Sequence, residues 1–263
     1  MNELFKKTSD LTAEEIQTIR RLLSGKQPFS IYFNAALDDL QHGLDNRSFH
    51  LNSEQGVAMG IDFDGLRIFS IVGKVGDEAV AVITADARRT EFHVTPEYAD
   101  LIVKLAGSRI TRKAQLKYYV LHRTDPYVLP PHDVRLLTPT DLPLVQRFYA
   151  QNYDATIFSA WMLEQPFVGL FANDTLVSAG GTIVMDKIDR AANVGNFLTA
   201  PAYRGRGHVQ TVAKVLINEL LRLGFSTFTL GTTEENVAAW QAWEAVGFRL
   251  LERRIEIETR AGI

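Results

Sequence analysis

One segment, Leu198–Gln210, constrains the fold of this chain more than any other. It joins a short apolar run and a proline turn to the loop Arg-Gly-Arg-Gly at 204–207, and a long amphipathic helix follows. The two glycines lack the Cβ atoms that keep a ligand away from the main chain, and the first amides of a helix have no acceptor within it. Such a helix start favours a bound anion, so the segment predicts a phosphate-binding strand, loop and helix.

The helix behind this loop has a regular apolar stripe. Val209, Val212 and Leu216 follow helical spacing, and Gly224 supplies a stop signal. Two other nucleotide-binding motifs do not fit. A dinucleotide-binding loop needs a small residue where Gln210 stands, and a P-loop needs Gly-Lys-Ser/Thr, which does not occur in the chain.

A second motif follows the first. The strand-like run 226–230 leads to Asn236, a predicted helix N-cap, and then to a predicted helix over Val237–Val246 closed by Gly247 and Phe248. Taken alone, the glycine loop would also suit a plain turn between a strand and a helix. The second motif, in this order and at this distance, argues against that reading.

Together the two segments resemble the GNAT superfamily of acyl-CoA-dependent N-acyltransferases. In that family an Arg/Gln-x-x-Gly-x-Gly/Ala loop binds the pyrophosphate of the coenzyme, and an Asn-x-x-Ala-x-x-Leu-Tyr-x-x-x-Gly-Phe helix lies near its sulfur. Residues 204–209 match the first motif except at the last position. The matching positions of the second motif are Asn236, Ala239, Gly247 and Phe248.

The resemblance implies a coenzyme A site, whose catalytic residues stay unassigned. The predicted cofactor-binding residues are Leu198, Thr199, Arg204, Gly205, Arg206, Gly207, His208, Val209, Asn236 and Trp243. Val209 replaces a residue that is usually small. Trp243 stands where many members have a tyrosine that protonates the leaving thiolate, and an indole N–H does not titrate usefully. The strand Asn193–Thr199 also lacks the glutamate that some members use as a base.

The implied function is an N-acetyltransferase that transfers an acetyl group from acetyl-CoA, its cosubstrate, to a primary amine of a small molecule or peptide. Two alternatives stay open: a non-catalytic sensor that keeps the fold and binds coenzyme A, and a scaffold whose first domain recruits a partner protein. Neither the amine nor the acyl chain length can be read from the sequence. The candidate acceptor loop is Tyr153–Gln165, although its Phe158, Trp161 and Met162 also suit a core.

Composition narrows the class of protein. The chain has no cysteine, which excludes disulfides, a thiolate nucleophile and cysteine-based zinc sites. Its six histidines lack a metal-ligand spacing, so we expect no metal. The 28 basic and 31 acidic residues form no long tract of one sign, and no apolar run reaches membrane length. We therefore expect a soluble, cytoplasmic monomer or homodimer without nucleic-acid or membrane partners.

A proline-rich seam at Arg123–His132 predicts two domains, 1–130 and 131–263. The second reads as a complete acyl-CoA-binding GNAT domain and the first as a degenerate GNAT-like domain, as in some bacterial tandem proteins; an unrelated α+β domain is the alternative. The expected fold class is α+β, with two mostly antiparallel mixed sheets flanked by helices.

The first half has its own predicted elements. No Arg-Gly-x-Gly loop precedes the helix that begins at Thr95-Pro96, so we place the coenzyme site in the second half. The other elements are a helix from a capping box at Thr12 to Leu23, a helix over Phe33–Leu40, and strands over Val57–Phe63, Leu66–Val72, Ala79–Thr84 and Leu116–His122.

Overall fold

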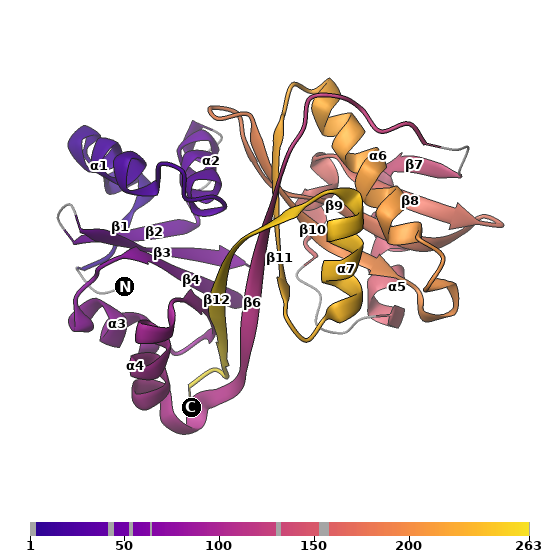
Figure 1. Cartoon of the computed structure of the whole chain (residues 1–263). Helices are drawn as coiled ribbons and strands as arrows, with labels where there is room; N and C mark the ends of the chain where they lie inside the picture. The colour runs from indigo at the N-terminus through magenta and orange to yellow at the C-terminus, as the bar shows by residue number, and fades with distance from the viewer. Residues whose placement is uncertain are drawn as a thin grey trace. The chain divides into compact units, whose positions relative to one another are not determined.

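The computed structural model describes residues 4–41, 45–52, 55–63, 65–129, 133–152 and 158–262. Contacts divide the chain into two units. Unit 1 comprises residues 1–118, 232–235 and 251–263, and unit 2 comprises residues 119–231 and 236–250. Each unit contains a mixed, mostly antiparallel sheet flanked by helices (Figure 1), which confirms the predicted fold class.

Unit 1 has two helical layers, one on each face of its sheet (Figure 1). The strand order is β1-β2-β3-β4-β5-β12-β6, and of the pairs from β1 to β12 only β4–β5 is parallel. Its elements are β1 (Lys6–Lys7), α1 (Ala13–Leu23), α2 (Phe29–Gln41), β2 (Arg47–Asn52), β3 (Gly56–Phe63), β4 (Leu66–Gly73), α3 (Asp77–Thr84), β5 (Arg89–Val94), α4 (Pro96–Ala106), β6 (Ile110–His122) and β12 (Arg249–Thr259).

Two predicted helix starts in unit 1 are confirmed. The Thr12 side chain accepts a hydrogen bond from the Glu15 amide, and the Glu15 side chain accepts one from the Thr12 amide, so the capping box forms. Helix α4 begins with Thr95 as N-cap and Pro96 in its first turn.

The predicted strand Ala79–Thr84 is wrong, because these residues form α3. Alternating β-branched residues favoured a strand. In the structure Gly76 opens a helix instead, and Val80, Ile83 and Thr84 turn the same side toward the core at helical spacing. The Thr84 hydroxyl also donates a hydrogen bond to the Val80 carbonyl one turn earlier.

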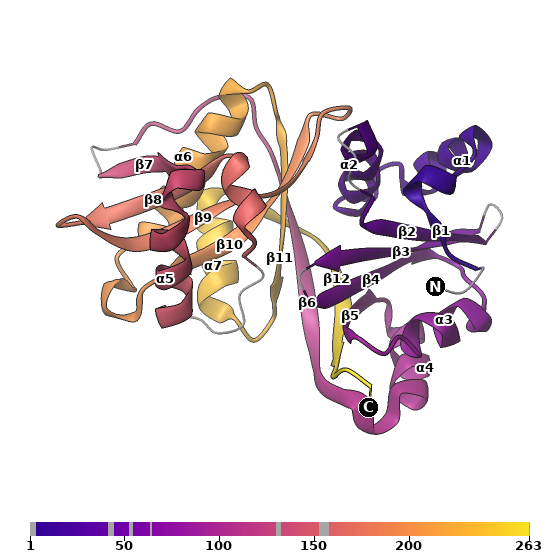
Figure 2. The same ribbon diagram turned by 180° about the vertical axis from the view of Figure 1, so that it is seen from behind.

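Unit 2 repeats the order of elements seen in unit 1. Its strand order is β11-β10-β9-β8-β7, antiparallel except for the parallel pair β10–β11. Helices α6 and α7 cover one face of the sheet, and α5 lies on the other face (Figure 2). Its elements are β7 (Val134–Leu137), α5 (Leu142–Asn152), β8 (Phe167–Ala172), β9 (Thr175–Asp186), β10 (Ala191–Thr199), α6 (His208–Arg222), β11 (Thr227–Thr233) and α7 (Val237–Val246).

The two units are not separated by the single boundary that the sequence predicts between residues 130 and 131. Strand β12 lies next to β5 in unit 1, with Glu256 opposite His93, so the C-terminal residues 251–263 belong to unit 1. The residues after Tyr118 belong to unit 2, including the described seam residues 123–129; residues 130–132 lie outside the described residues. The proline-rich seam in the sequence cannot show that the C-terminal strand belongs to unit 1, because strand pairing decides which sheet a terminal strand joins.

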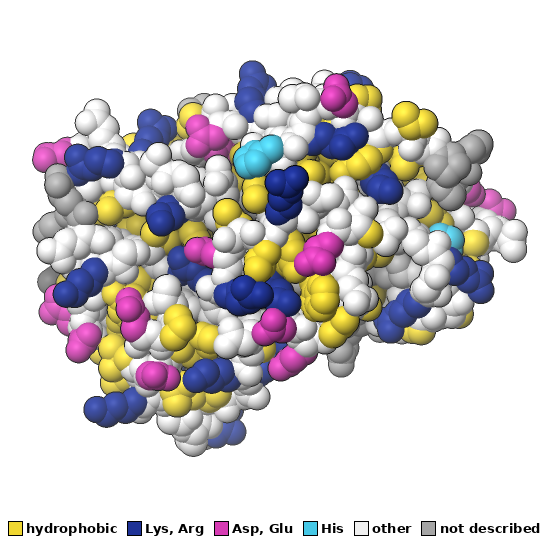
Figure 3. Space-filling model, in the orientation of Figure 1, with side chains coloured by type: hydrophobic (Ala, Val, Ile, Leu, Met, Phe, Trp, Pro, Cys, Tyr) yellow, Lys and Arg dark blue, Asp and Glu magenta, His cyan; other side chains and the backbone are white. Residues whose placement is uncertain are grey.

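Apolar side chains from facing elements fill each core. In unit 2, Val212, Leu216 and Leu220 of α6 are fully buried against the sheet, as the predicted stripe requires. Among the described helices, none combines the length and apolar character needed to cross a bilayer. Basic and acidic side chains are intermixed over the face drawn in Figure 3.

Candidate functional site

The glycine loop before α6 has the backbone that a phosphate loop requires. Gly205 and Gly207 both have φ of +75°, in the left-handed region that L side chains rarely adopt. Gly207 is the N-cap of α6 and supplies no side-chain cap, and the first intrahelical bond runs from the Thr211 amide to the Gly207 carbonyl (3.1 Å). No side chain caps this turn, so the start of the helix suits an external acceptor.

The loop is tied to the sheet by its own arginine. The Arg204 Nε donates a hydrogen bond to the Thr199 carbonyl at the end of β10 (3.1 Å). The Arg206 guanidinium lies 5.6 Å from the centre of the Tyr203 ring. Both arginines and both glycines of the loop are exposed to solvent, which leaves two positive charges beside the start of α6.

The predicted residues that flank the loop differ in burial. Leu198 and Thr199 are half-buried at the end of β10, and His208 and Val209 are half-buried in the first turn of α6. Val209 packs against the core cluster of unit 2. Its side chain therefore belongs to the apolar stripe of the helix.

Strands β10 and β11 part just below this loop. They pair in parallel from Ala191/Thr227 to Asn193/Thr229, where the Asn193 side chain donates to the Thr229 hydroxyl (3.0 Å). Beyond that point β10 runs on to Thr199 and β11 to Thr233, with no further pairing between them in these fully described strands. Beyond Asn193 and Thr229, the main-chain groups of β10 and β11 therefore do not pair with each other.

A bulge in β10 lies inside this separation. The register of β10 against β9 shifts between Gly195 and Leu198, and Asn196 adopts a φ of +53°. Tyr149 of α5 holds this strained residue by donating its hydroxyl hydrogen to the Asn196 carbonyl. Burial raises the pKa of Tyr149, so the hydroxyl stays protonated and keeps its role as donor.

The second motif forms as predicted, and its tryptophan is buried. The Asn236 side chain accepts a hydrogen bond from the Ala239 amide (3.2 Å), which confirms the N-cap, and Gly247 ends α7 in a left-handed conformation. Trp243 is 5% exposed, and its ring centre lies 4.7 Å from that of Phe197 in the β10 bulge. The indole thus fills the position of the usual acid with an aromatic contact.

The candidate acceptor loop is partly outside the described residues, which exclude 153–157. Of its described part, Phe158 stacks on Tyr149 with ring centres 5.3 Å apart, and Met162 is completely buried. Trp161 is 39% exposed and is available for a ligand contact. The expectation that these side chains suit a core holds for Phe158 and Met162.

A cavity of about 660 Å³ in unit 1 has a charged rim that sequence reasoning missed. Buried Arg67 pairs with Asp62 and Asp86, and Arg88 pairs with the same two carboxylates. Burial acts to raise the pKa of Asp86, but hydrogen bonds from Arg88 and the charge of Arg67 hold it at about 2. These four charges pair with one another at the cavity.

All ten predicted cofactor-binding residues lie in unit 2. The structure brings the end of β10, the glycine loop and the first turn of α6 into one continuous stretch of chain, and the Trp243 ring reaches the β10 bulge. Sequence reasoning missed Tyr149 and Asn196. No motif marks them, because their contact depends on the packing of α5.

Comparison with known proteins agrees with this geometry. Residues 136–248 match the model of the acetyltransferase (GNAT) family. No curated protein matches the chain. A solved Drosophila protein has 14% identity, with 100% of both chains covered and a TM-score of 0.74. A GCN5-related N-acetyltransferase-like protein from Streptococcus suis has 15% identity, 94% and 99% coverage of this and that chain, and a TM-score of 0.65. A putative acetyltransferase from Novosphingobium aromaticivorans has 17% identity, 87% and 96% coverage, and a TM-score of 0.61. At these identities the likeness shows the fold.

Proposed function

We propose that the protein transfers an acetyl group from acetyl-CoA to a primary amine of a small molecule or peptide, because residues 136–248 match the model of the acetyltransferase (GNAT) family. One observation carries the proposal: two left-handed glycines precede α6, which has no side-chain cap, and β10, which leads to this loop, separates from β11 before it. A helix start suited to an anion, next to two strands that separate, suits a long cosubstrate with a phosphorylated end and a reactive end.

The loop residues hold the phosphorylated end in this proposal. The first amides of α6 point outward at its positive pole and donate to pyrophosphate oxygens. Arg204 and Arg206 add charge-assisted contacts, and the bond from Arg204 to the Thr199 carbonyl keeps the loop in register with β10. A ligand bound here would extend along β10 toward the bulge at Asn196.

The chemistry is attack of the neutral amine nitrogen on the thioester carbonyl. The new C–N bond forms, the C–S bond breaks, the sulfur leaves as a thiolate, and the amine gives its proton to water. Main-chain amides of the β10 bulge polarise the carbonyl, and the Tyr149 hydroxyl keeps the bulge in place. A free thiol titrates near 8.5, so the thiolate is an adequate leaving group without a protein acid. The indole of Trp243 takes no part in proton transfer.

Trp243 is buried and supplies no acid at the position where many GNAT enzymes have a tyrosine. This favours a second candidate function, a protein that binds coenzyme A without turnover. One experiment separates the two. Purified protein is given acetyl-CoA and a panel of amines, amino acids and peptides while free thiol is followed, and coenzyme A binding is measured by calorimetry. Amine-dependent thiol release supports the enzyme, and binding without release supports the sensor. Absence of coenzyme A binding would refute both.

A further inference from the structure

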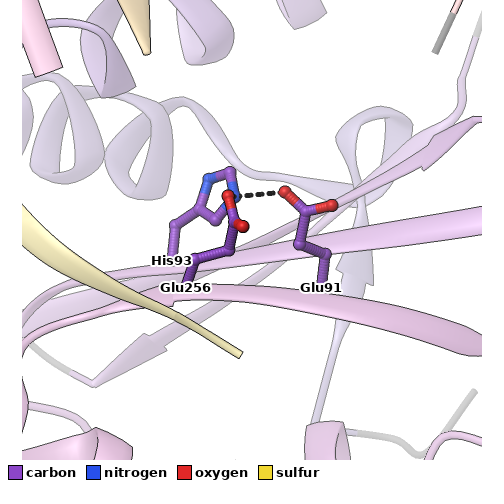
Figure 4. Close-up of side chains that lie close together, drawn as sticks. All are labelled: Glu91, His93 and Glu256. Carbon is purple, nitrogen blue, oxygen red and sulfur yellow. Dashed lines mark hydrogen bonds and ion pairs between the residues drawn. The ribbon is translucent and has the colours of Figure 1, made fainter. Parts of the chain in front are cut away.

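Unit 1 contains a buried group of three metal-ligand side chains that the proposed function does not use. Glu91 and His93 alternate with Phe92 on β5, so both point to the same face of the sheet. Glu256 of β12 lies directly opposite His93 in the antiparallel register. Figure 4 shows the three side chains converging, and their donor atoms all lie within 4.8 Å of one another.

Neighbouring residues aim the three donor atoms inward. The His93 Nε2 lies 2.5 Å from a Glu91 oxygen and 3.7 Å from the Glu256 Oε2. Arg112 binds the other Glu256 oxygen (2.5 Å), which leaves Oε2 for the centre of the group. The Tyr118 hydroxyl oxygen lies 2.7 Å from the His93 Nδ1, where it can accept the Nδ1–H of an imidazole whose Nε2 binds a metal.

The surrounding charges leave room for a divalent cation. A network of ion pairs and hydrogen bonds surrounds the group, and His93 is part of it. The network contains the carboxylates of Glu91, Glu235, Glu252, Glu256 and Glu258 and the guanidinium groups of Arg89, Arg112 and Arg254. With His93 neutral, a divalent cation would balance the charges of the two carboxylates at the centre, those of Glu91 and Glu256. The Glu91, His93 and Glu256 side chains are at most 16% exposed, so solvent screens these two carboxylates poorly.

A small cavity adjoins His93, the one member of the group that lines it. It has a volume of about 30 Å³ and is lined by His93, Ser70, Tyr32 and three apolar side chains. This volume equals about one water molecule. Three protein donors and one water complete a tetrahedral zinc site with an open position.

We propose that Glu91, His93 and Glu256 bind one divalent transition-metal ion of the zinc type in unit 1. Nitrogen and carboxylate donors suit zinc, which binds them at about 2.0 to 2.2 Å. Tetrahedral ligands at that distance lie roughly 3.3 Å apart, so the Glu91 oxygen must withdraw from Nε2 by less than about 1 Å. The site joins β5 to the C-terminal strand and so ties residues 251–263 to unit 1. The histidine spacing used in the sequence could not indicate it, because two ligands lie on β5 and the third on β12.

The proposal rests on neither coenzyme A binding nor acetyl transfer. Full-length protein is treated with EDTA, desalted and titrated with ZnCl₂ in a calorimeter, and crystals grown with zinc are measured at the zinc absorption edge. We expect one zinc ion per chain and an anomalous peak between Glu91, His93 and Glu256. A wild-type protein that binds no zinc, or a peak elsewhere, would overturn the proposal.

Variants separate this site from surface binding. His93→Gln and Glu91→Gln should each weaken zinc binding at least about 100-fold, since loss of an outer-shell partner alone costs 10- to 100-fold. The control His122→Gln removes a histidine of unit 2 and no proposed ligand, so it should change zinc affinity by less than about threefold. Unchanged zinc affinity in folded Glu91→Gln would also refute the site, whether or not His93→Gln folds.

Discussion

Gly207→Ala tests the phosphate loop with a change of one methyl group. Gly207 has φ of +75°, and a Cβ placed there would meet its nearest atom, the Gln210 Oε1, at 3.8 Å. The substitution therefore causes no clash within the protein. It acts through backbone strain and through the methyl group that it places at the start of α6.

The two effects have different expected sizes. An L residue in the left-handed region costs about 1 to 2 kcal/mol, which should appear as lost folding stability. A methyl group where phosphate oxygens approach the first amides of α6 should weaken coenzyme A binding at least tenfold, or about 1.4 kcal/mol. Urea denaturation measures the first effect, and calorimetry with coenzyme A measures the second.

Gly65 provides the matched control. It has φ of +76° and no atom within 4 Å of an added Cβ, and it lies in unit 1. Gly65→Ala should lose a similar stability while its coenzyme A affinity stays at the wild-type value. Equal affinity in folded Gly207→Ala and in wild type would refute the placement of the pyrophosphate at this loop.

Three further changes probe unit 2. Tyr149→Phe leaves the Asn196 carbonyl without its hydrogen-bond donor, so we expect a loss of folding stability of about 1 to 2 kcal/mol. We also expect a lower kcat at unchanged KM for acetyl-CoA. An unchanged kcat would show that the β10 bulge takes no part in the reaction. Trp243→Phe should keep kcat within about twofold, because the indole supplies no proton, and a tenfold loss would assign it a role. Hydrogen bonds from Arg135 hold the pKa of Asp141 at about 2, below the 3.8 of the unfolded chain. The ionised Asp141 carboxylate therefore stabilises the fold above pH 3.8, and this stabilisation is lost as the pH falls toward 2. In urea denaturation, Asp141→Asn should be less stable than wild type at pH 7, and the difference in stability between the two should narrow below about pH 4.

Local signals predicted some helix boundaries closely. The bounds of α7 follow from Asn236 and Gly247, because an N-cap side chain and a left-handed glycine act on their own neighbours in sequence. Ala79–Thr84 shows the limit of such signals. Its β-branched residues favour a strand by propensity, and packing of Val80 and Ile83 against the core of unit 1 makes them helical.

The same distinction between local and long-range contacts applies to the candidate site. The glycine loop could be predicted, because its function depends on consecutive backbone groups between residues 204 and 209. The contact of Tyr149 with Asn196 and the group around His93 could not, because each joins distant segments. A shift of one residue in the pairing of β5 with β12 would turn Glu256 to the opposite face and disperse the second group.

The two units share most of their order of elements but differ at the helix start where we propose that the coenzyme binds. Helix α3 follows β4 in unit 1 as α6 follows β10 in unit 2. Its N-cap, Gly76, has an ordinary φ of −72°, and Asp77 and Glu78 occupy its first turn, where their carboxylates already satisfy the positive pole and repel an anion. The first turn of α6 has no acidic residue and is preceded by two arginines and two left-handed glycines. The difference lies in the few residues before and after each helix start, so the same topology supports anion binding in unit 2 and opposes it in unit 1.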